Sequence, residues 1–252
     1  MPVFSVFWLE TRSYVTNVSA LFWTIFYPVM MLVFLILLFD PGGAESDGFR
    51  FVSVIGLTML TLVSTAIFGL ALSIGENRAH NALLFYVASP YSLFGVTLSL
   101  VLSRVTVILG FSMFFITGAF LVLGLEHKLT LTVALVGLAA LAMASMFCFG
   151  VALGVARICK NSQSMLAIAN IVNIYALMSS NVFVPVEVLP SWSAGFITTS
   201  PFYHLNGMLI AAFSGEGLTY VYNAGTAMLV LGLALIWSAS DRNLYVAAGR
   251  AR

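Results

Sequence analysis

Residues 93–123 read LFGVTLSLVLSRVTVILGFSMFFITGAFLVL, an apolar run in which Arg104 is the only charged residue. A helix needs about 20 predominantly apolar residues to cross the hydrocarbon core of a bilayer. The run therefore predicts a membrane-spanning helix. Its excess length predicts that this helix is tilted or broken, with Gly110 and Gly118 as weak points.

The rest of the chain has the same apolar character. Of its 252 residues, 61% are hydrophobic and only 8% are charged, whereas a soluble domain carries about 25% charged residues. With a mean hydropathy of +1.07, the chain cannot build a water-exposed surface, so the bilayer is predicted to be its solvent. The net charge of +1 and the lack of a basic run indicate no nucleic-acid partner.

Further apolar segments predict five more spans, at residues 18–39, 51–75, 130–156, 165–184 and 218–238, which makes six in all. The fold class predicted is an all-α membrane protein. Before the first span, residues 1–17 predict a helix lying in the membrane interface, because aromatic side chains could share one side of it. These are Phe4, Phe7, Trp8 and Tyr14. The alternative is a simple extension of the first span.

The stretch 185–217 is unlike the other apolar segments. Pro185, Pro190 and Pro201 interrupt it and leave two apolar pieces that are each too short to span. Non-helical backbone at membrane depth must be shielded by protein or line a wet cavity. The stretch therefore predicts a re-entrant hairpin of two half-length helices.

Basic residues are distributed unevenly between the predicted loops. With the N-terminus in the cytoplasm, eight of the ten are cytoplasmic, counting Arg104 if its side chain extends toward that surface. Only Arg50 and Lys128 lie outside. This bias follows the positive-inside rule and predicts a multi-pass protein of the bacterial cell (inner) membrane with both termini cytoplasmic. The hairpin at 185–217 then enters from outside.

Motifs for catalysis and metal binding are missing from the sequence. No G-x-x-x-x-G-K-[ST] occurs to hold ATP phosphates, and no H-E-x-x-H occurs. No catalytic residue and no metal ligand is predicted, and Cys148 and Cys159 are interpreted as two free thiols. Only Arg104 places a charge within a span, so coupling to protons or sodium is not indicated. The chain is predicted not to be an enzyme, and energy for transport must come from elsewhere.

The second span is followed by Gly75-Glu-Asn-Arg-Ala-His-Asn-Ala-Leu-Leu-Phe-Tyr-Val-Ala-Ser-Pro90. This segment resembles the cytoplasmic coupling segment of ABC-2 export permeases, which has an acidic residue, a charged stretch, Gly-Thr, a short amphipathic helix and Ser/Thr-Pro. Glu76 matches the acid and Ser89-Pro90 match the closing pair. His80-Asn81 replace Gly-Thr, and Leu83 stands where an acid is common.

A second segment, residues 180–204, looks like the Ser-Gly-x-x-x-Pro…Leu-Pro-x-Trp…Pro signature that precedes the last span in the same family. The matching residues are Pro185, Leu189, Pro190, Trp192 and Pro201. Asn181 replaces the usual glycine. The order of elements also agrees: interfacial helix, spans, coupling helix and outer hairpin.

The resemblance implies a single transmembrane permease domain, residues 1–252, of a type V ABC exporter. It implies a second permease subunit, in a homodimer or a heterodimer of like subunits, surrounded by membrane lipid. It also implies two ATP-binding-cassette ATPase subunits below, which bind ATP and Mg, so this chain itself holds no cofactor. The N-terminal helix and residues 76–90 would form the docking surface, and the first and fifth spans would line the transport route.

Three groups of candidate site residues follow. Coupling to the ATPase is assigned to Glu76, Arg78, Leu83, Leu84 and Pro90. Lining of the path is assigned to Asn170, Asn173 and Asn181, because a bare amide in lipid is costly. An outer gate is assigned to Phe183, Pro185, Pro190 and Trp192.

Each group has a plainer interpretation. The coupling charges could be solvated loop residues that end a span, the asparagines could make hydrogen bonds between helices, and the aromatic residues could anchor the outer surface. Gly150-x-x-x-Gly154 predicts close helix packing.

The predicted function is export of an amphipathic, lipid-like or drug-like substrate from the cytoplasm, because no cluster of acids or bases lines the predicted path. An ATP-independent membrane channel or scaffold is the alternative. A membrane-embedded enzyme is disfavoured because polar residues do not converge.

Overall fold

A computed structural model describes residues 2–16, 22–39, 47–79, 92–159, 161–182, 190–241 and 244. Within these ranges the chain forms helices joined by turns and contains no strand, so the all-α prediction is confirmed. The α-helices are α1 (Pro2–Val15), α3 (Tyr27–Phe39), α4 (Asp47–Ser64), α5 (Leu72–Ala79), α7 (Leu93–Leu123), α8 (Leu131–Ile158), α9 (Ser162–Ser179), α10 (Ser191–Thr198), α11 (Pro201–Ser214) and α12 (Leu218–Ala239). Two π-helices, η1 (Phe22–Phe26) and η2 (Thr65–Ala71), and a 3-10 turn, η3 (Glu126–Lys128), complete the described elements.

Four helical stretches are long and apolar enough to cross a membrane: Asp47–Arg78, Leu93–Leu123, Leu131–Ile158 and Leu218–Ala239. They correspond to the second, third, fourth and sixth predicted spans, and α7 has the bounds that its sequence predicts. The first and fifth predicted spans contain shorter apolar helices, Thr24–Leu38 and Gln163–Ser179. The structure therefore supports a multi-pass membrane protein, whereas the sixfold crossing stays a prediction.

The fifth predicted span, residues 165–184, ends earlier than expected. Helix α9 stops at Ser179, and Asn181 adopts a left-handed conformation with φ of 59°. Asparagine enters this conformation more readily than most residues because its short polar side chain can bond locally, and the conformation cannot continue an α-helix. At about 1.5 Å per residue, the 18 residues of α9 extend about 27 Å, slightly less than the hydrocarbon core of about 30 Å.

Local capping residues fix the turn between α7 and α8. Gly124 ends α7 with φ of 73°, which glycine adopts without a steric penalty. The side chain of Thr130 accepts a hydrogen bond from the Val133 amide and so begins α8. At the other end of α7, Ser92 caps the first turn in the same way through the Gly95 amide.

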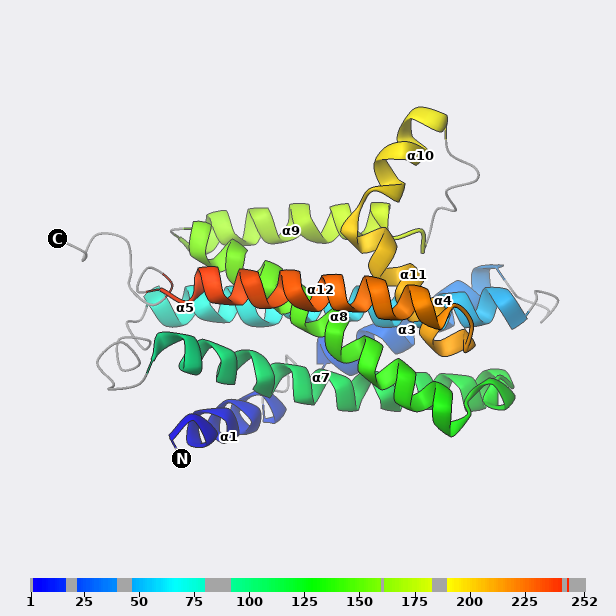
Figure 1. The fold of residues 1–252 in the computed structure, drawn as a ribbon, viewed down its shortest axis with the longest axis horizontal. Coiled ribbons are helices and arrows are strands. Elements are labelled where there is room, and N and C mark those ends of the chain that lie inside the picture. The colour runs from blue at the N-terminus through cyan, green and yellow to red at the C-terminus, as the bar shows by residue number, and fades with distance from the viewer. Residues whose placement is uncertain are drawn as a thin grey trace.

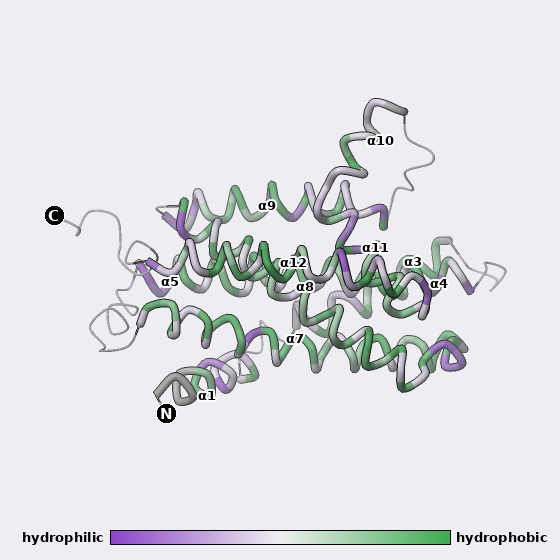
Figure 2. The backbone as a smooth tube through the Cα atoms, in the orientation of Figure 1, coloured by the Kyte–Doolittle hydropathy of each residue, from purple (hydrophilic) through white to green (hydrophobic). Residues whose placement is uncertain are grey.

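The second predicted span is the central helix of the bundle. Helices α4, η2 and α5 form one continuous helix. In its most apolar 18-residue stretch, 83% of the residues are buried within the chain, whereas the corresponding share for α12 is 28%. Around this helix pack α8, α9, α11 and α3, and α1 lies along α7 (Figure 1). Figure 2 shows hydrophobic residues along the helix lengths and hydrophilic ones gathered at the end of α5 and at η3. The outward faces of the other spans are thus available to lipid.

Helices α8 and α12 cross at two glycines. A Cβ atom added to Gly150 would lie 2.8 Å from the Gly232 carbonyl oxygen, and one added to Gly232 would lie 2.7 Å from the backbone of Met146. Small residues allow such backbone approach inside a bilayer. The Gly150-x-x-x-Gly154 motif contributes only its first residue to this crossing, because among the described residues no atom of another helix lies within 4 Å of a Cβ built on Gly154.

We therefore expect Gly232→Ala and Gly150→Ala to lower the free energy of unfolding by about 1–3 kcal/mol, the usual cost of overpacking. Thermal unfolding of the detergent-solubilised protein measures this change. Gly154→Ala is the matched control and should leave the midpoint unchanged. An equal loss in all three variants would contradict the crossing described.

Candidate functional site

The two charged residues predicted to couple to the ATPase lie in different surroundings. Glu76 is exposed on α5, whereas Arg78 is only 5% exposed. The Arg78 guanidinium donates from Nη2 to the Ala156 carbonyl at 2.7 Å, from Nη1 to the Cys159 carbonyl at 2.9 Å and from Nε to the Leu244 carbonyl at 3.0 Å. Its side chain is therefore occupied within this chain. Leu83, Leu84 and Pro90 lie outside the described residues.

Two of the partners of Arg78, Ala156 and Cys159, belong to the C-terminal end of α8. A helix leaves its last four carbonyls without partners inside the helix, and a cation there also interacts favourably with the helix dipole. Arg78 supplies both the donors and the charge. Beside it, Arg157 donates to Asp241 at 2.8 Å, so the end of α8 is also joined to the second residue after α12. This second pair is exposed, and such pairs contribute little to stability.

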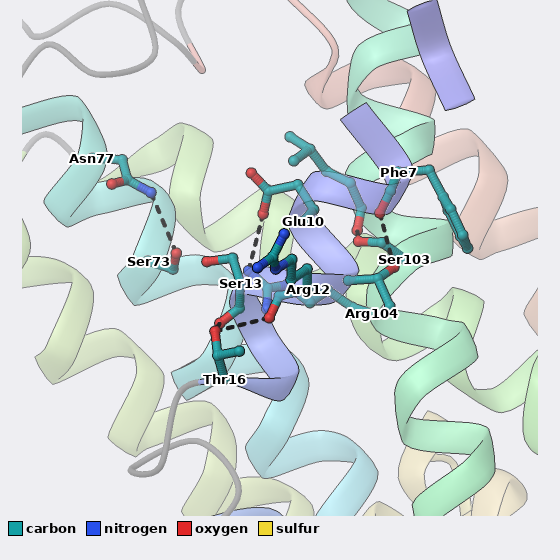
Figure 3. Close-up of polar contacts among 11 residues, drawn as sticks. Phe7, Glu10, Arg12, Ser13, Thr16, Ser73, Asn77, Ser103 and Arg104 are labelled. Atoms are coloured by element: carbon teal, nitrogen blue, oxygen red, sulfur yellow. Dashed lines mark hydrogen bonds and ion pairs between the residues drawn. The ribbon is translucent and has the colours of Figure 1, made fainter. Parts of the chain in front are cut away.

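A second buried arginine joins α1 to α7, as Figure 3 shows. Arg104 is 8% exposed and lies 3.2 Å from the Glu10 carboxylate, and its guanidinium carbon lies 4.5 Å from the centre of the Tyr14 ring. Glu10 and Tyr14 are one helical turn apart, so both face α7. An arginine inside a span thus has its charge balanced by an acid on a neighbouring helix, as the cost of an isolated intramembrane charge requires.

Tyr14 extends this contact to the first predicted span. Its hydroxyl lies 2.8 Å from the Thr24 hydroxyl in η1. Burial raises the pKa of Tyr14 above its ordinary value, although Thr24 and Arg104 oppose the change, so the phenol stays neutral. The aromatic residues of α1 do not form one face, because Tyr14 is buried whereas Trp8 is 61% exposed.

The asparagines predicted to line the path have separate environments. Asn173 accepts a hydrogen bond from Ser64 at 2.9 Å and so connects α9 to the end of α4. Asn170 is exposed and donates to the Leu166 carbonyl of its own helix at 3.0 Å. Asn181 is half-buried in the turn after α9. The Asn173 contact has the form of the hydrogen bond between helices that the sequence left as an alternative, and a role in the path stays a prediction.

Around Asn170, the exposed face of α9 is apolar. It presents Leu166, Ile171, Ile174 and Met178 at helical spacing. This face combines one amide with four large hydrophobic side chains and carries no charge. It can contact lipid, another protein surface or an amphipathic molecule.

Helices α10 and α11 are each too short to cross a bilayer, as the sequence predicts for the hairpin. Figure 1 shows α10 projecting away from the bundle beyond the end of α9. The end of α9 is joined to the start of α11. The Ser200 hydroxyl donates to the Ser179 hydroxyl at 2.8 Å, and the Asn206 amide donates to the Ser180 carbonyl at 2.8 Å. The ring of Tyr175 also contacts Phe202.

Of the residues assigned to the outer gate, Pro190 and Trp192 are both exposed, Trp192 to 81%. Phe183 and Pro185 lie outside the described residues. The structure therefore gives α10 an exposed aromatic surface, and its role as a gate stays a prediction.

A small hollow lies between η1, α4 and α7. It has a volume of only about 10 Å³ and is lined by Thr24, Thr58, Thr61 and Ser112, among apolar side chains. Drug-sized ligands occupy cavities of about 300–1,000 Å³, so this hollow is too small for an amphipathic cargo molecule.

Among the described residues, no three His, Cys, Asp or Glu side chains are grouped as a metal site. Cys148 and Cys159 are both buried free thiols, and burial raises the pKa of Cys159 above its ordinary value. The sequence reasoning found Arg104 but not its partner Glu10. The only sequence signal for this pair is that a charge within a span needs an opposite charge nearby.

Comparison with known proteins gives one family. A family model described as ABC-2 type transporter matches residues 2–214, which includes every described helix except α12. No curated protein matches the chain.

We expect the hydrogen bond between Ser64 and Asn173 to stabilise the packing of α9. A double-mutant cycle with Ser64→Ala and Asn173→Ala should give a coupling energy of about 0.6 kcal/mol, the average for side-chain hydrogen bonds in a membrane protein. Equilibrium unfolding of the solubilised protein measures it. A cycle that pairs Ser64→Ala with Asn170→Ala should give no coupling, and equal coupling in both cycles would contradict the assignment.

Proposed function

Because the chain belongs to the ABC-2 type transporter family, as a transmembrane subunit that is not itself the ATPase, we propose that it forms the membrane part of an ATP-driven exporter. The observation that carries this proposal is the family match over residues 2–214 on a chain whose long helices are apolar enough to span a bilayer. Membership implies association with an ATP-binding-cassette ATPase. That partner binds ATP and Mg, since the sequence has no P-loop of its own.

The ATPase docks at the end of the bundle where α5 finishes, which is the cytoplasmic end. Residues 76–90 form the coupling segment. Glu76 supports this assignment because its carboxylate is exposed and can pair with a basic residue of the partner. Arg78 is removed from the set of docking side chains, because its donors are used on carbonyls of this chain.

The substrate moves between two copies of the chain rather than through one. The hollow lined by Ser112 is too small for a cargo molecule, whereas the uncharged face of α9 around Asn170 is exposed over several turns. The first and fifth predicted spans line this route, in a homodimer or a heterodimer of like subunits. A surface with one amide among large apolar side chains suits an amphipathic, lipid-like or drug-like cargo, because small ions need charged or carbonyl ligands.

The hairpin of α10 and α11 closes the outer end of the route, with Trp192 at its exposed surface. The protein lies in the bacterial cell (inner) membrane with both termini cytoplasmic, which is supported by the excess of basic residues in the loops on that side. Export out of the cytoplasm is the direction that the resemblance of residues 76–90 and 180–204 to ABC-2 export permeases implies.

A tagged chain purified from its native host should carry a soluble P-loop ATPase with it. Glu76→Lys should weaken this association, because a rim charge of the wrong sign is repelled by a complementary basic site. Recovery of the ATPase by quantitative pull-down is the measurement. Glu126→Lys is the control, since this exposed carboxylate precedes α8 at the opposite end of the bundle. Absence of any ATPase from the wild-type preparation would favour the ATP-independent channel or scaffold.

Reconstituted complexes should hydrolyse ATP faster in the presence of amphipathic compounds than in the presence of sodium or potassium salts. Asn170→Asp places a charge on the exposed face of α9, which should reduce stimulation by a neutral amphipathic compound without changing the basal ATPase rate. Asn223→Asp, at an exposed position of α12, provides the control. Stimulation that survives Asn170→Asp unchanged would place the route elsewhere.

A further inference from the structure

Arg78 and its three carbonyl partners form the Arg78 cluster: Arg78 with Ala156, Cys159 and Leu244. Their backbone groups come from the end of α8 and from the chain beyond α12, which are distant from Arg78 in sequence. A guanidinium has several N–H donors in one rigid plane, so one side chain can hold two segments at once. Lysine cannot reproduce this geometry, because its ammonium is a compact charge on a flexible stem.

Arg104 and its partners form the Arg104 cluster: Arg104 with Glu10, Tyr14 and, through Tyr14, Thr24. This cluster joins α7 to α1 and to η1. Both arginines are nearly excluded from solvent, and both use their charge on groups of this chain. Neither guanidinium is therefore presented to a partner as a docking charge.

The two arginines lie near the two ends of the coupling segment. Arg78 is in the last turn of α5 (Leu72–Ala79), where the segment begins, and Arg104 is about three helical turns into α7 (Leu93–Leu123), which follows the segment. Each end of the segment is thus joined to a helix that is not its neighbour in the sequence. These are α8 at one end and α1 at the other.

We propose that Arg78 and Arg104 are positioning residues for energy coupling. They pass the movement of the coupling segment to two different helices. The Arg78 cluster transmits it to the end of α8, and the Arg104 cluster transmits it to α1. This inference rests on the proposed function, because it requires an ATPase that moves residues 76–90. It assigns to Arg78 a role inside the chain in place of the contact with the ATPase that the sequence predicts.

A purely static role is the competing explanation, and the two differ in what each variant changes. If the clusters only stabilise the fold, a substitution lowers the yield of folded complex and leaves the response of each folded molecule to ATP intact. If they transmit movement, each substitution removes the response of one helix and preserves that of the other. The result that distinguishes the two explanations is that each variant loses the response of a different helix and keeps the response of the other.

Hydrogen exchange of the complete transporter complex, compared without nucleotide and with a non-hydrolysable ATP analogue, measures these responses. In the wild-type complex we expect nucleotide-dependent changes in peptides from α1 and from the end of α8. Arg78→Lys should abolish the change at α8 and retain that at α1. Glu10→Gln should do the opposite, and both variants should lose substrate stimulation of ATP hydrolysis.

Arg157→Lys is the matched control for Arg78→Lys, since Arg157 lies at the same helix end but pairs with Asp241 in solvent. It should keep both responses. Exchange of the two charges, Glu10→Arg with Arg104→Glu, should restore the α1 response that Glu10→Gln removes. Should Arg78→Lys give no folded complex, the α1 response of Glu10→Gln decides the inference alone.

The outcomes separate the two proposals. If the wild-type chain captures no ATPase, the proposed function and this inference both fail. If the complex forms and both helices respond to nucleotide in both variants, only the inference is overturned. The inference also fails if either variant reduces both responses together.

Discussion

The absence of water from the hydrocarbon core limits where polar groups can lie in the membrane-spanning part of this protein. Backbone N–H and C=O groups in lipid must find partners within the protein, which explains why the described segments at membrane depth are helical. The same constraint acts on the helix ends and on charged side chains. Arg78 satisfies carbonyls at the end of α8, and Glu10 balances the charge of Arg104. Each arginine has partners in this chain that offset the loss of hydration, fully for Arg78 and in part for Arg104, whose Nε is buried without a partner among the described residues.

The continuous helix α4–η2–α5 has a different relation to its surroundings from that of the other spans. Most of its apolar window is enclosed by protein, whereas α12 keeps most of its surface outward. In a bilayer, apolar side chains gain little from leaving lipid for protein, so close contact depends on fitted backbones and hydrogen bonds. The crossing of Gly150 and Gly232 brings two helix backbones into close contact, and the Ser64 hydroxyl provides a hydrogen bond to Asn173. The bundle is therefore stabilised by a few specific contacts beside its many apolar ones.

These contacts are arranged so that the two ends of the bundle differ. At the α5 end, charged side chains connect α1, α5, α7, α8 and the residues after α12. At the α10 end, neutral hydroxyls, an amide and aromatic rings connect α9 to α11. A charged, firmly connected end is suited to receive force from a soluble partner, and a neutral aromatic end is suited to seal a route for an amphipathic molecule. The proposed position of the ATPase, at the α5 end, agrees with this difference.

The sequence by itself determined the helical class, the bounds of α7 and the family, because apolar length and motif spacing are local properties that a bilayer selects directly. It also identified Arg104 as unusual. Only the tertiary structure decided that Arg78 turns inward, that Glu10 is the partner of Arg104, and that Asn170 and Asn173 have different surroundings. It likewise decided that Gly150 meets Gly232 while Gly154 does not meet another helix. The reason is physical: each depends on which helix lies opposite, and the rotation of one helix against another is set by packing between segments far apart in the chain.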